Sequence, residues 1–279
     1  MVKPSCRREM AVTAVSRRGI SIRKACLFFS VSENCYRYTK KNSSKNQLIA
    51  EYLQKLAYEN KSWGFGLCFL YLRNVKGYHW NHKRVYRIYR ELELNLRIKP
   101  KRRLVRETPQ PLSVPDNINE CWSIDFMYDQ LVDGRSVRLF NVLDDCNREA
   151  LGIETDFSLP SERVIRTLNR IIEWRGKPEA IRCDNGSEFT SKKTMKWAAD
   201  NGIELKFIEP GKPQQNAYIE RFNRTVRYDW LGQYQFGSLS TLQDFSTRWL
   251  WKYNHERPNM GLGGFTPNQH LQKMYLQCA

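Results

Sequence analysis

Hydrophobic residues alternate with polar ones in three short segments after residue 118, and this spacing predicts three β-strands. In CWSIDFMY, Trp122, Ile124 and Phe126 fall on one face of the strand, while Asp125 falls on the other. VRLFNVLDDC and EALGIETDF follow as two more strands, joined by a short turn near Asn147. Strands joined by such short connections are expected to run antiparallel.

Helical spacing then alternates with two further strands. SERVIRTLNRIIEW and SKKTMKWAADNG are predicted helices, the first capped by Ser161 and ended by Gly176. EAIRCDNGSEF and IELKFIEP are predicted strands, the first of which runs into a turn. The order β-β-β-α-β-α-β-α predicts an α/β domain with a mixed five-stranded sheet and helices packed on it.

The stretch PGKPQQNAYIERFNRTVRYDWL (210–231) predicts a helix that starts near Pro213 and has two unlike faces. One face is an apolar stripe that would pack on a core, formed by Ile219, Phe222, Val226 and Trp230. The other face has two amides, two guanidinium groups and one carboxylate, on Asn216, Asn223, Arg224, Arg227 and Glu220. This face is either solvated, with an i,i+4 Glu220–Arg224 pair, or built to hold an anion.

The first 96 residues show only helical spacing, in two units. Residues 1–42 predict a helix over 4–18 and two short helices capped by Ser21 and Ser32, the order of a helix-turn-helix unit. Residues 46–96 predict a second helical DNA-binding unit, whose last helix is capped by Asn81. That helix has an apolar face and a basic face suited to DNA phosphates, formed by Lys83, Arg84, Arg87 and Arg90. A solvated basic face is the alternative.

The change in pattern along the chain predicts five parts. They are a helix-turn-helix unit (1–42), a second helical unit (46–96), a basic and proline-rich linker (97–117), an α/β core (118–232) and a C-terminal helical extension (233–279).

Charge is distributed unevenly over these parts. The chain of 279 residues has 46 Lys and Arg against 29 Asp and Glu, a formal net charge of +17. Residues 1–120 hold 25 basic and 9 acidic side chains, whereas residues 121–279 hold 21 and 20. Such segregation favours a front end that binds nucleic acid and a separate, nearly neutral back end.

Several classes of protein do not fit the composition. No apolar run approaches the roughly 20 residues that span a bilayer, and the first residues lack the apolar region of a secretory signal. The eight cysteines are far apart without a CxxC pair, so we expect reduced thiols. His79 and His82 have no paired cysteines at zinc-finger spacing. We therefore expect a cytoplasmic, nucleoid-associated protein without a membrane partner.

Three carboxylates on three predicted elements suggest a metal site. Asp125 interrupts an otherwise apolar strand, where an unpaired charge is costly. Asp184 follows a strand, at the edge where α/β sheets place their sites, and Glu220 lies on the helix after the last strand. Carboxylate oxygens suit hard divalent cations, and two Mg²⁺ ions can promote phosphodiester chemistry.

Each acid also has a structural explanation. DNG is an ordinary turn sequence, Glu220 can pair with Arg224, and Asp125 can satisfy a buried donor. The order and placement of all three favour the metal site. Asp144, Asp145 and Glu188 are further acids that could lie near it without being its ligands.

Asp125, Asp184 and Glu220, with 35 residues between the last two, resemble the D,D-35-E signature of retroviral integrases and related transposases. WSIDFMYD, RCDNGSEF, KPQQNAYIERFNRTVR and YNHERPNMGLGGFTP are similar to blocks of the IS-three family of bacterial insertion-sequence transposases, in its second-reading-frame product. The front segments VSENCYRY and NHKRVYRIYREL are similar as well.

The resemblance implies an RNase H-like integrase core that depends on Mg²⁺ or Mn²⁺ and cleaves and joins double-stranded DNA at an element's ends. It implies a homo-oligomer on paired ends, with the first-reading-frame product as partner or frameshift fusion. It makes Asp125, Asp184 and Glu220 the catalytic metal ligands. Asn185 and Gly186 would shape the turn, and DNA contacts would come from Gln215, Asn216, Arg221 and Arg227, beside Asn223 and Arg224 on the same helix.

The leading hypothesis is therefore a metal-dependent DNA transposase. One alternative is a catalytically silent DNA-binding regulator or element relic, which predicts a broken set of carboxylates. Another is a simple nuclease of RNase H-like fold, which leaves the basic helical front end unexplained. No separate role for YNHERPNMGLGGFTP follows from the sequence beyond an ordered loop packed on the core.

Overall fold

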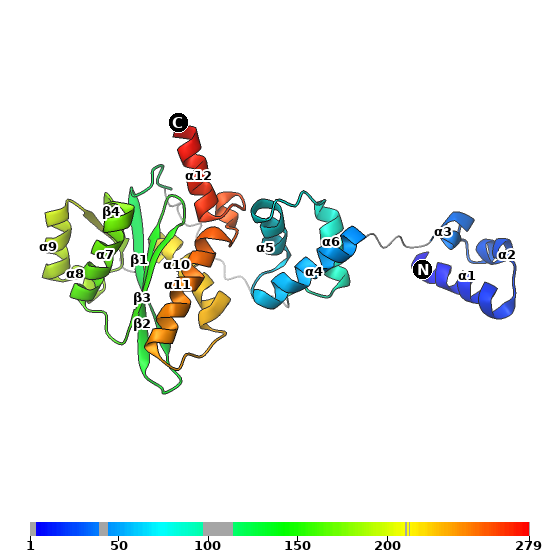
Figure 1. The fold of residues 1–279 in the computed structure, drawn as a ribbon, viewed down its shortest axis with the longest axis horizontal. Coiled ribbons are helices and arrows are strands. Elements are labelled where there is room, and N and C mark those ends of the chain that lie inside the picture. The colour runs from blue at the N-terminus through cyan, green and yellow to red at the C-terminus, as the bar shows by residue number, and fades with distance from the viewer. Residues whose placement is uncertain (1–3, 39–43, 97–113, 210, 212, 279) are drawn as a thin grey trace. The chain divides into compact units, whose positions relative to one another are not determined.

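The computed structural model describes residues 4–38, 44–96, 114–209, 211 and 213–278. The chain divides into two compact units, residues 1–48 and 49–279 (Figure 1). The predicted linker over 97–117 lies outside the described residues except for its last four positions.

The first unit consists of three short helices, α1 (Pro4–Arg18), α2 (Ile22–Phe28) and α3 (Glu33–Arg37). They pack through small side chains, because Ala11, Ala14, Ala25 and Cys26 are buried. The predicted cap of α3 is confirmed, since the Ser32 hydroxyl accepts a hydrogen bond from Cys35 N at 3.2 Å. Helix, turn and helix are present in the predicted order, with a last helix of only five residues.

The second unit begins with what we call the helical segment, residues 49–96. It contains most of α4 (Ser44–Glu59), then α5 (Phe65–Leu70), the π-helical turn η1 (Tyr71–Val75) and α6 (His82–Glu91). Its apolar side chains form a core of their own around Leu53, Leu72 and Tyr89. The Asn81 side chain accepts hydrogen bonds from Lys83 N and Arg84 N, which confirms the predicted cap.

A mixed five-stranded sheet forms the centre of the second unit, as predicted. The strand order is β3-β2-β1-β4-β5, in which β1, β2 and β3 pair antiparallel and β4 and β5 add parallel to β1. The strands span β1 Cys121–Gln130, β2 Ser136–Asp144, β3 Ala150–Asp156, β4 Ala180–Cys183 and β5 Glu204–Phe207.

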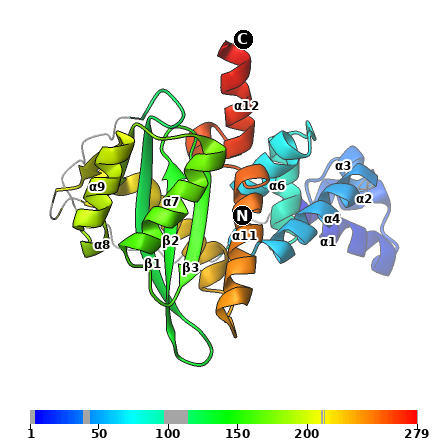
Figure 2. The same cartoon turned by 60° about the vertical axis from the view of Figure 1, so that its left-hand side comes forward.

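Helices cover both faces of this sheet (Figures 1 and 2). On one face, Trp122, Ile124 and Phe140 pack with side chains of α7 (Ser161–Arg175) and α9 (Lys192–Asn201). On the other face lie α10 (Ala217–Val226) and α11 (Leu239–His255). The predicted alternation of β1 is confirmed, because Trp122 and Ile124 belong to the first core and Met127 to the second.

The predicted helix after β5 consists of three pieces. A 3₁₀ turn, η2 (Pro213–Asn216), leads into α10, and a π-helical turn, η3 (Arg227–Leu231), follows. The apolar stripe is confirmed, because Ile219, Phe222, Val226 and Trp230 are all buried on the sheet.

Two predicted caps differ in the structure. Ser21 is the N-cap residue of α2, but its side chain makes no capping hydrogen bond. Pro160, not Ser161, is the N-cap of α7, and the Ser161 hydroxyl donates instead to Glu188 O at 3.0 Å. Gly176 ends this helix with φ +91°, as predicted. The remaining elements are α8 (Ser187–Thr190), η4 (Met260–Leu262) and α12 (Pro267–Cys278). Among the described helices, none has the length and apolar character needed to cross a membrane.

Candidate active site

Asp125 and Asp184 are neighbours at one edge of the sheet. Ser123 on β1 pairs with Arg182 on β4, so continuing this parallel register by two residues sets Asp125 beside Asp184. Adjacent strands are about 4.8 Å apart. The sheet therefore brings together two carboxylates that are 59 positions apart in the chain.

A chain of amides orients Asp125. Asn141 lies opposite Asp125 on β2, is fully buried, and donates through Nδ2 to Asn223 Oδ1 at 2.7 Å. Asn223, on α10, donates in turn to Asp125 Oδ2 at 2.7 Å. The other oxygen, Asp125 Oδ1, accepts from Phe126 N at 2.8 Å. Sequence reasoning missed Asn141, although an asparagine within the apolar run of VRLFNVLDD was a usable signal.

The surroundings disfavour the charged form of Asp125. Burial raises its pKa to about 6, the hydrogen bonds from Phe126 and Asn223 oppose this shift, and the nearby charges of Asp184 and Glu220 add to it. Burial also raises the pKa of Glu220, against the attraction of Arg224. The charges of Asp184 and Glu220 thus both act on Asp125, and we call these three residues the acidic cluster. A buried carboxylate with charged acidic neighbours is typical of functional sites.

The turn after β4 fixes the backbone around Asp184. Asp184 Oδ1 accepts from Gly186 N at 3.0 Å, and Asn185 Nδ2 donates to Ile208 O at 2.8 Å. A Cβ on Gly186 would lie 2.9 Å from Asp184 Oδ1, so this position has no room for a side chain while the carboxylate keeps this rotamer.

The cluster fits a hard divalent cation by its chemistry, since its donors are carboxylate oxygens. Within the described residues, however, no three His, Cys, Asp or Glu side chains converge closely enough to hold an ion. The three carboxylates would have to come closer together to share one. A cation there would relieve the repulsion that raises the pKa of Asp125.

The other acids considered from the sequence have separate partners. Asn141 lies opposite Asp125 on β2, whereas Asp144 lies opposite Trp122. Asp144 and Asp145 therefore follow the position opposite Asp125 by three and four residues. Asp145 accepts from the Ser123 hydroxyl at 2.6 Å and forms an ion pair with Arg182 at 2.5 Å.

Glu188 also has a partner of its own. It forms an ion pair with Arg138 at 2.6 Å. The Arg138 guanidinium lies over the Phe126 ring, 4.2 Å from its centroid. Phe126 packs with the core that contains Trp122 and Ile124, on the face of β1 opposite Asp125, so the Arg138 guanidinium of this pair lies on that face.

The residues proposed as DNA contacts near α10 fall into two groups. Arg221 and Arg224 are exposed on the helix surface. The other four make internal contacts: Gln215 with Glu209, Asn216 with Ile124 O, Asn223 with Asp125, and Arg227 with Asp129 and Tyr128 O. Asn216 is only 3% exposed, so its side chain joins η2 to β1.

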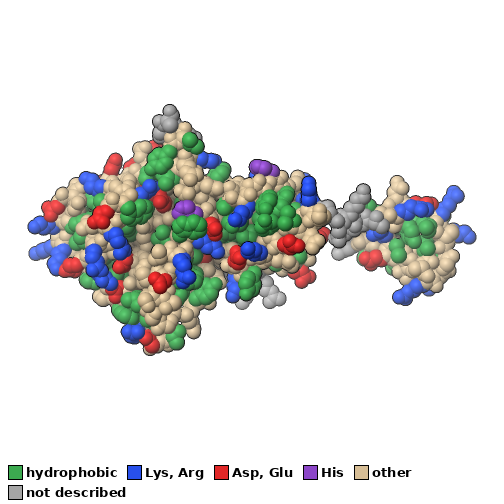
Figure 3. All heavy atoms as spheres, viewed as in Figure 1, with side chains coloured by type: hydrophobic (Ala, Val, Ile, Leu, Met, Phe, Trp, Pro, Cys, Tyr) green, Lys and Arg blue, Asp and Glu red, His purple; other side chains and the backbone are tan. Residues whose placement is uncertain are grey.

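The basic face predicted for residues 81–94 lies on α6. Lys83, Arg87 and Arg90 are exposed, while Arg84 is half-buried. Arg87 also contacts Glu91 at 3.8 Å, a surface pair of little energetic weight. On the face seen in Figure 3, basic side chains are spread over both units with acidic ones among them, rather than gathered in one patch.

Comparison with known proteins assigns the family. Integrase core domain models match residues 115–213 and 201–267. The 31.7 kDa protein of insertion element IS407 from Burkholderia multivorans is 38% identical over 254 residues, 91% of each chain. Transposase InsD of insertion element IS2D from Escherichia coli is 27% identical over 200 residues, covering 69% of this chain and 66% of the relative. The chain belongs to the insertion-element transposases with an integrase core.

Both matched regions contain parts of the acidic cluster. The first holds Asp125 and Asp184, and the second holds Glu220 together with the segment 253–267 of this transposase. Among solved structures, the catalytic core of BIV integrase aligns with a TM-score of 0.45 and 20% identity, over 58% of this chain and 99% of that one. The integrase core model over residues 115–213 includes all five strands of the sheet, so the sheet is that of an integrase core.

Proposed function

We propose that this transposase cleaves DNA at the ends of its insertion element and joins those ends to target DNA in a metal-dependent reaction. The observation that carries the proposal is the acidic cluster, in which the register of β1 and β4 sets Asp125 beside Asp184, and the charges of Asp184 and Glu220 add to the burial that raises the pKa of Asp125. Carboxylates brought near one another from β1, the turn after β4 and α10 disfavour the charged form of Asp125, whereas they suit a cation-dependent reaction at phosphorus.

In this proposal, Asp125, Asp184 and Glu220 hold Mg²⁺ or Mn²⁺, with two ions in the active complex. When bound, such ions activate an attacking oxygen and stabilise the leaving oxygen of a phosphodiester. Asn223 and Asn141 keep the Asp125 carboxylate in place through their two 2.7 Å hydrogen bonds. The exposed Arg221 and Arg224, on the same helix as Glu220, are placed to contact phosphates of the bound strand.

The helices at the front of the chain would hold the DNA. The candidate surfaces are the short helices α2 and α3, which the sequence predicts as part of a helix-turn-helix unit, and the exposed cations of α6. We further propose that the chain acts as a homo-oligomer on paired ends, as a second-reading-frame product of the IS-three type, with the first-reading-frame product as partner or fusion.

A catalytically silent DNA-binding protein is the second candidate. The observation that favours it is the absence, among the described residues, of three acidic groups close enough to hold an ion. The two candidates differ in whether DNA is cut, so one assay separates them.

The assay incubates the purified protein with labelled DNA carrying the element's ends, with Mg²⁺ or with EDTA, beside Asp184→Asn and Glu220→Gln. We expect Mg²⁺-dependent nicking and strand joining by the parent, a loss of at least about 10³-fold in both variants, and unchanged DNA binding. Asp200→Asn, an exposed carboxylate on α9, is the matched control and should react like the parent. Binding without cutting by the parent would favour the silent protein, and variants as active as the parent would refute the assignment of the acids.

A further inference from the structure

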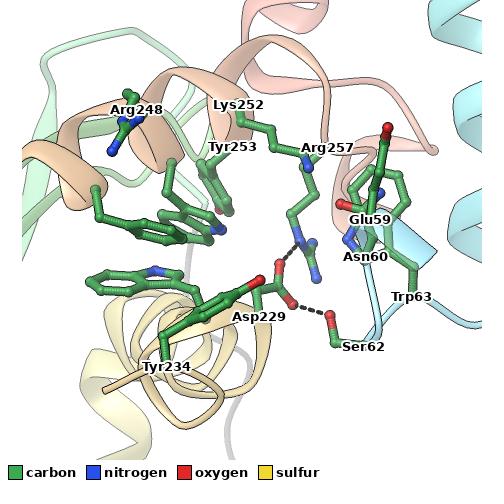
Figure 4. A pocket seen from close by; sticks show the side chains of 13 residues that line it. Glu59, Asn60, Ser62, Trp63, Asp229, Tyr234, Arg248, Lys252, Tyr253 and Arg257 are labelled. Atoms are coloured by element: carbon green, nitrogen blue, oxygen red, sulfur yellow. Dashed lines mark hydrogen bonds and ion pairs between the residues drawn. The ribbon is translucent and has the colours of Figure 1, made fainter. Parts of the chain in front are cut away.

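Two sets of hydrogen bonds join the helical segment to the C-terminal part of the core. The first centres on Asp229 in η3, whose carboxylate lies between two elements (Figure 4). Asp229 Oδ1 accepts from the Ser62 hydroxyl at 2.7 Å, and Asp229 Oδ2 accepts from Arg257 Nε at 2.8 Å. The Asp229 side chain is 8% exposed and that of Arg257 is 16% exposed. A buried, charge-assisted bridge of this kind is strongly directional.

The second set centres on Asn74 in η1. Asn74 Nδ2 donates to Gly264 O at 2.7 Å, and Gln269 Nε2 donates to Asn74 O at 2.7 Å. Gln269 is itself held, because its Oε1 accepts from Thr266 N at 3.0 Å and Thr266 is fully buried. The backbone carbonyl and the side chain of Asn74 are thus both bound by the segment 257–269.

Close backbone contact accompanies these bonds. Gly264 has φ +84°, and a Cβ there would lie 2.6 Å from Leu70 Cδ2 in α5. The turn around Gly264 therefore passes the helical segment at a distance that leaves no space for a side chain unless Leu70 moves. Gly264 belongs to YNHERPNMGLGGFTP, the block whose separate role does not follow from the sequence.

We call the contact between the helical segment and the C-terminal part of the core the junction. On each side of the junction, one of the bonded residues lies in a π-helical turn. Lys76 N donates to Tyr71 O at 3.0 Å in η1, and Gly232 N donates to Arg227 O at 2.8 Å in η3. π-helical turns are rare and often mark functional positions. Here one turn carries Asn74 and the other carries Asp229, so both irregularities serve the same contact.

Apolar packing alone does not close the junction. A cavity of about 280 Å³ remains between the two sides, lined by Trp63 of the helical segment and by Trp230 and Trp249 of the core, among others (Figure 4). The relative position of the two sides is consequently set by the directional hydrogen bonds more than by a continuous core.

The junction is connected directly to the acidic cluster. Asp229 follows Glu220 by nine residues in one continuous helical run, α10 and η3, which is roughly 13 Å at 1.5 Å per residue. A shift of the helical segment against η3 would therefore be a shift against the helix that carries Glu220.

We propose that residues 257–269, with Asp229, form a clamp that fixes the helical segment on the catalytic core, so that DNA held by α6 meets the acidic cluster at one defined phosphodiester. The placing of DNA rests on the proposed function and deepens it. The clamp itself rests only on the contacts between the helical segment and the core. Asn74, Asp229 and Gly264 are positioning residues, since none belongs to the acidic cluster.

The test compares the full chain with Ser62→Ala/Asn74→Ala by hydrogen exchange and by mapping the nicked position on labelled end DNA. Both substitutions lie in the helical segment and outside its apolar core, so the Asp229–Arg257 pair and the sheet keep their own contacts. Ser240→Ala/Asn95→Ala, which changes one exposed serine and one exposed asparagine elsewhere, is the matched control.

We expect amides of residues 60–76 and 256–269 to exchange at least about tenfold faster in the variant, with β1 and β2 unchanged and the control like the parent. We also expect the single nicked position to spread over several neighbouring ones at unchanged DNA affinity. Unchanged exchange at the junction would overturn the clamp. Faster exchange with a single nicked position would overturn its role in placing DNA.

Two further results separate the clamp from the proposed function. If the sheet also exchanged faster, the contacts would support the whole fold and the clamp would be refuted. A parent that never nicks DNA would refute the proposed function and the DNA step, while the exchange result would still decide the clamp.

Discussion

Two groups of acids on the same sheet have opposite surroundings. Asp144 and Asp145, at the end of β2, are fully buried and fully bonded: Asp144 accepts from Asn119 N and Cys146 N, and Asp145 from Ser123 and Arg182. Asp125 is bonded by neutral donors, while its charged neighbours are two further carboxylates, on Asp184 and Glu220.

Burial raises the pKa in both groups, to about 6 for both Asp125 and Asp144, so burial does not distinguish them. The difference lies in the neighbouring charges. At Asp144 the charge of Arg175 lowers the pKa and that of Glu149 raises it, whereas at Asp125 the two neighbouring charges, on Asp184 and Glu220, both raise it. An acid held against other acids needs a cation to become stable, and this is the physical mark of the candidate active site.

The largest expected effect is on Asp125 itself. Asp125→Asn should reduce Mg²⁺-dependent nicking at least about 10³-fold, because a metal ligand is lost. The same variant should be more stable than the parent at pH 7 by about 1 kcal/mol, because a charge repelled by Asp184 and Glu220 is gone. Nicking rates and urea unfolding would measure both. A variant that is inactive only because it unfolds would refute the comparison.

Asp145 should behave in the opposite way. Asp145→Ala leaves Arg182 buried without its ion-pair partner, so we expect a loss of about 3 kcal/mol in the free energy of unfolding. Urea unfolding measures this loss, with Asp200→Asn as a control that should stay within about 0.5 kcal/mol. If Asp145→Ala were as stable as the parent and unable to nick DNA, Asp145 would belong to the active site.

Asn223 tests whether the amides serve the cluster. Asn223→Ala removes two hydrogen bonds, the one that Asn223 donates to Asp125 and the one that it accepts from Asn141. We therefore expect nicking to fall about 10- to 100-fold with DNA binding retained. Asn201→Ala, on α9, is the control for loss of an asparagine side-chain bond away from the cluster. If binding fell with nicking unchanged per bound complex, Asn223 would act as a DNA contact instead.

The sequence predicted most of this architecture because its signals are periodic. Alternation predicts that Trp122 and Ile124 share one face of β1, and helical spacing predicts the apolar stripe of α10. Both predictions are confirmed. Contacts between distant residues left no such signal. Nothing in the sequence around Asn216, Asn223 or Arg227 reveals that each side chain bonds to β1, since the sequence of an amide or guanidinium residue is the same whether it contacts DNA or a strand.

The junction was hidden for the same reason. Ser62, Asn74 and Asp229 are ordinary polar residues in sequence, and their partners lie at least 28 positions away. The π-helical turns that present Asn74 and Asp229 differ from α-helix by one hydrogen-bond step, which side-chain periodicity does not resolve over five residues.

The smallest expected effect concerns pH and metal. A raised pKa means that the folded protein keeps the Asp125 proton when the unfolded chain has lost it, so stability should fall as pH rises from about 4 to about 6 and then level off. Asp144 contributes in the same direction, so Asp125→Asn should flatten this slope only in part.

Millimolar Mg²⁺ at pH 7 should then stabilise the parent by about 1 kcal/mol and Asp125→Asn by less, because the ion offsets the repulsion only where all three acids remain. Thermal unfolding with Mg²⁺ and with EDTA measures this difference. An equal gain in both proteins would place the ion elsewhere, since Asp144 and Asp145 already have their partners and gain nothing from a cation.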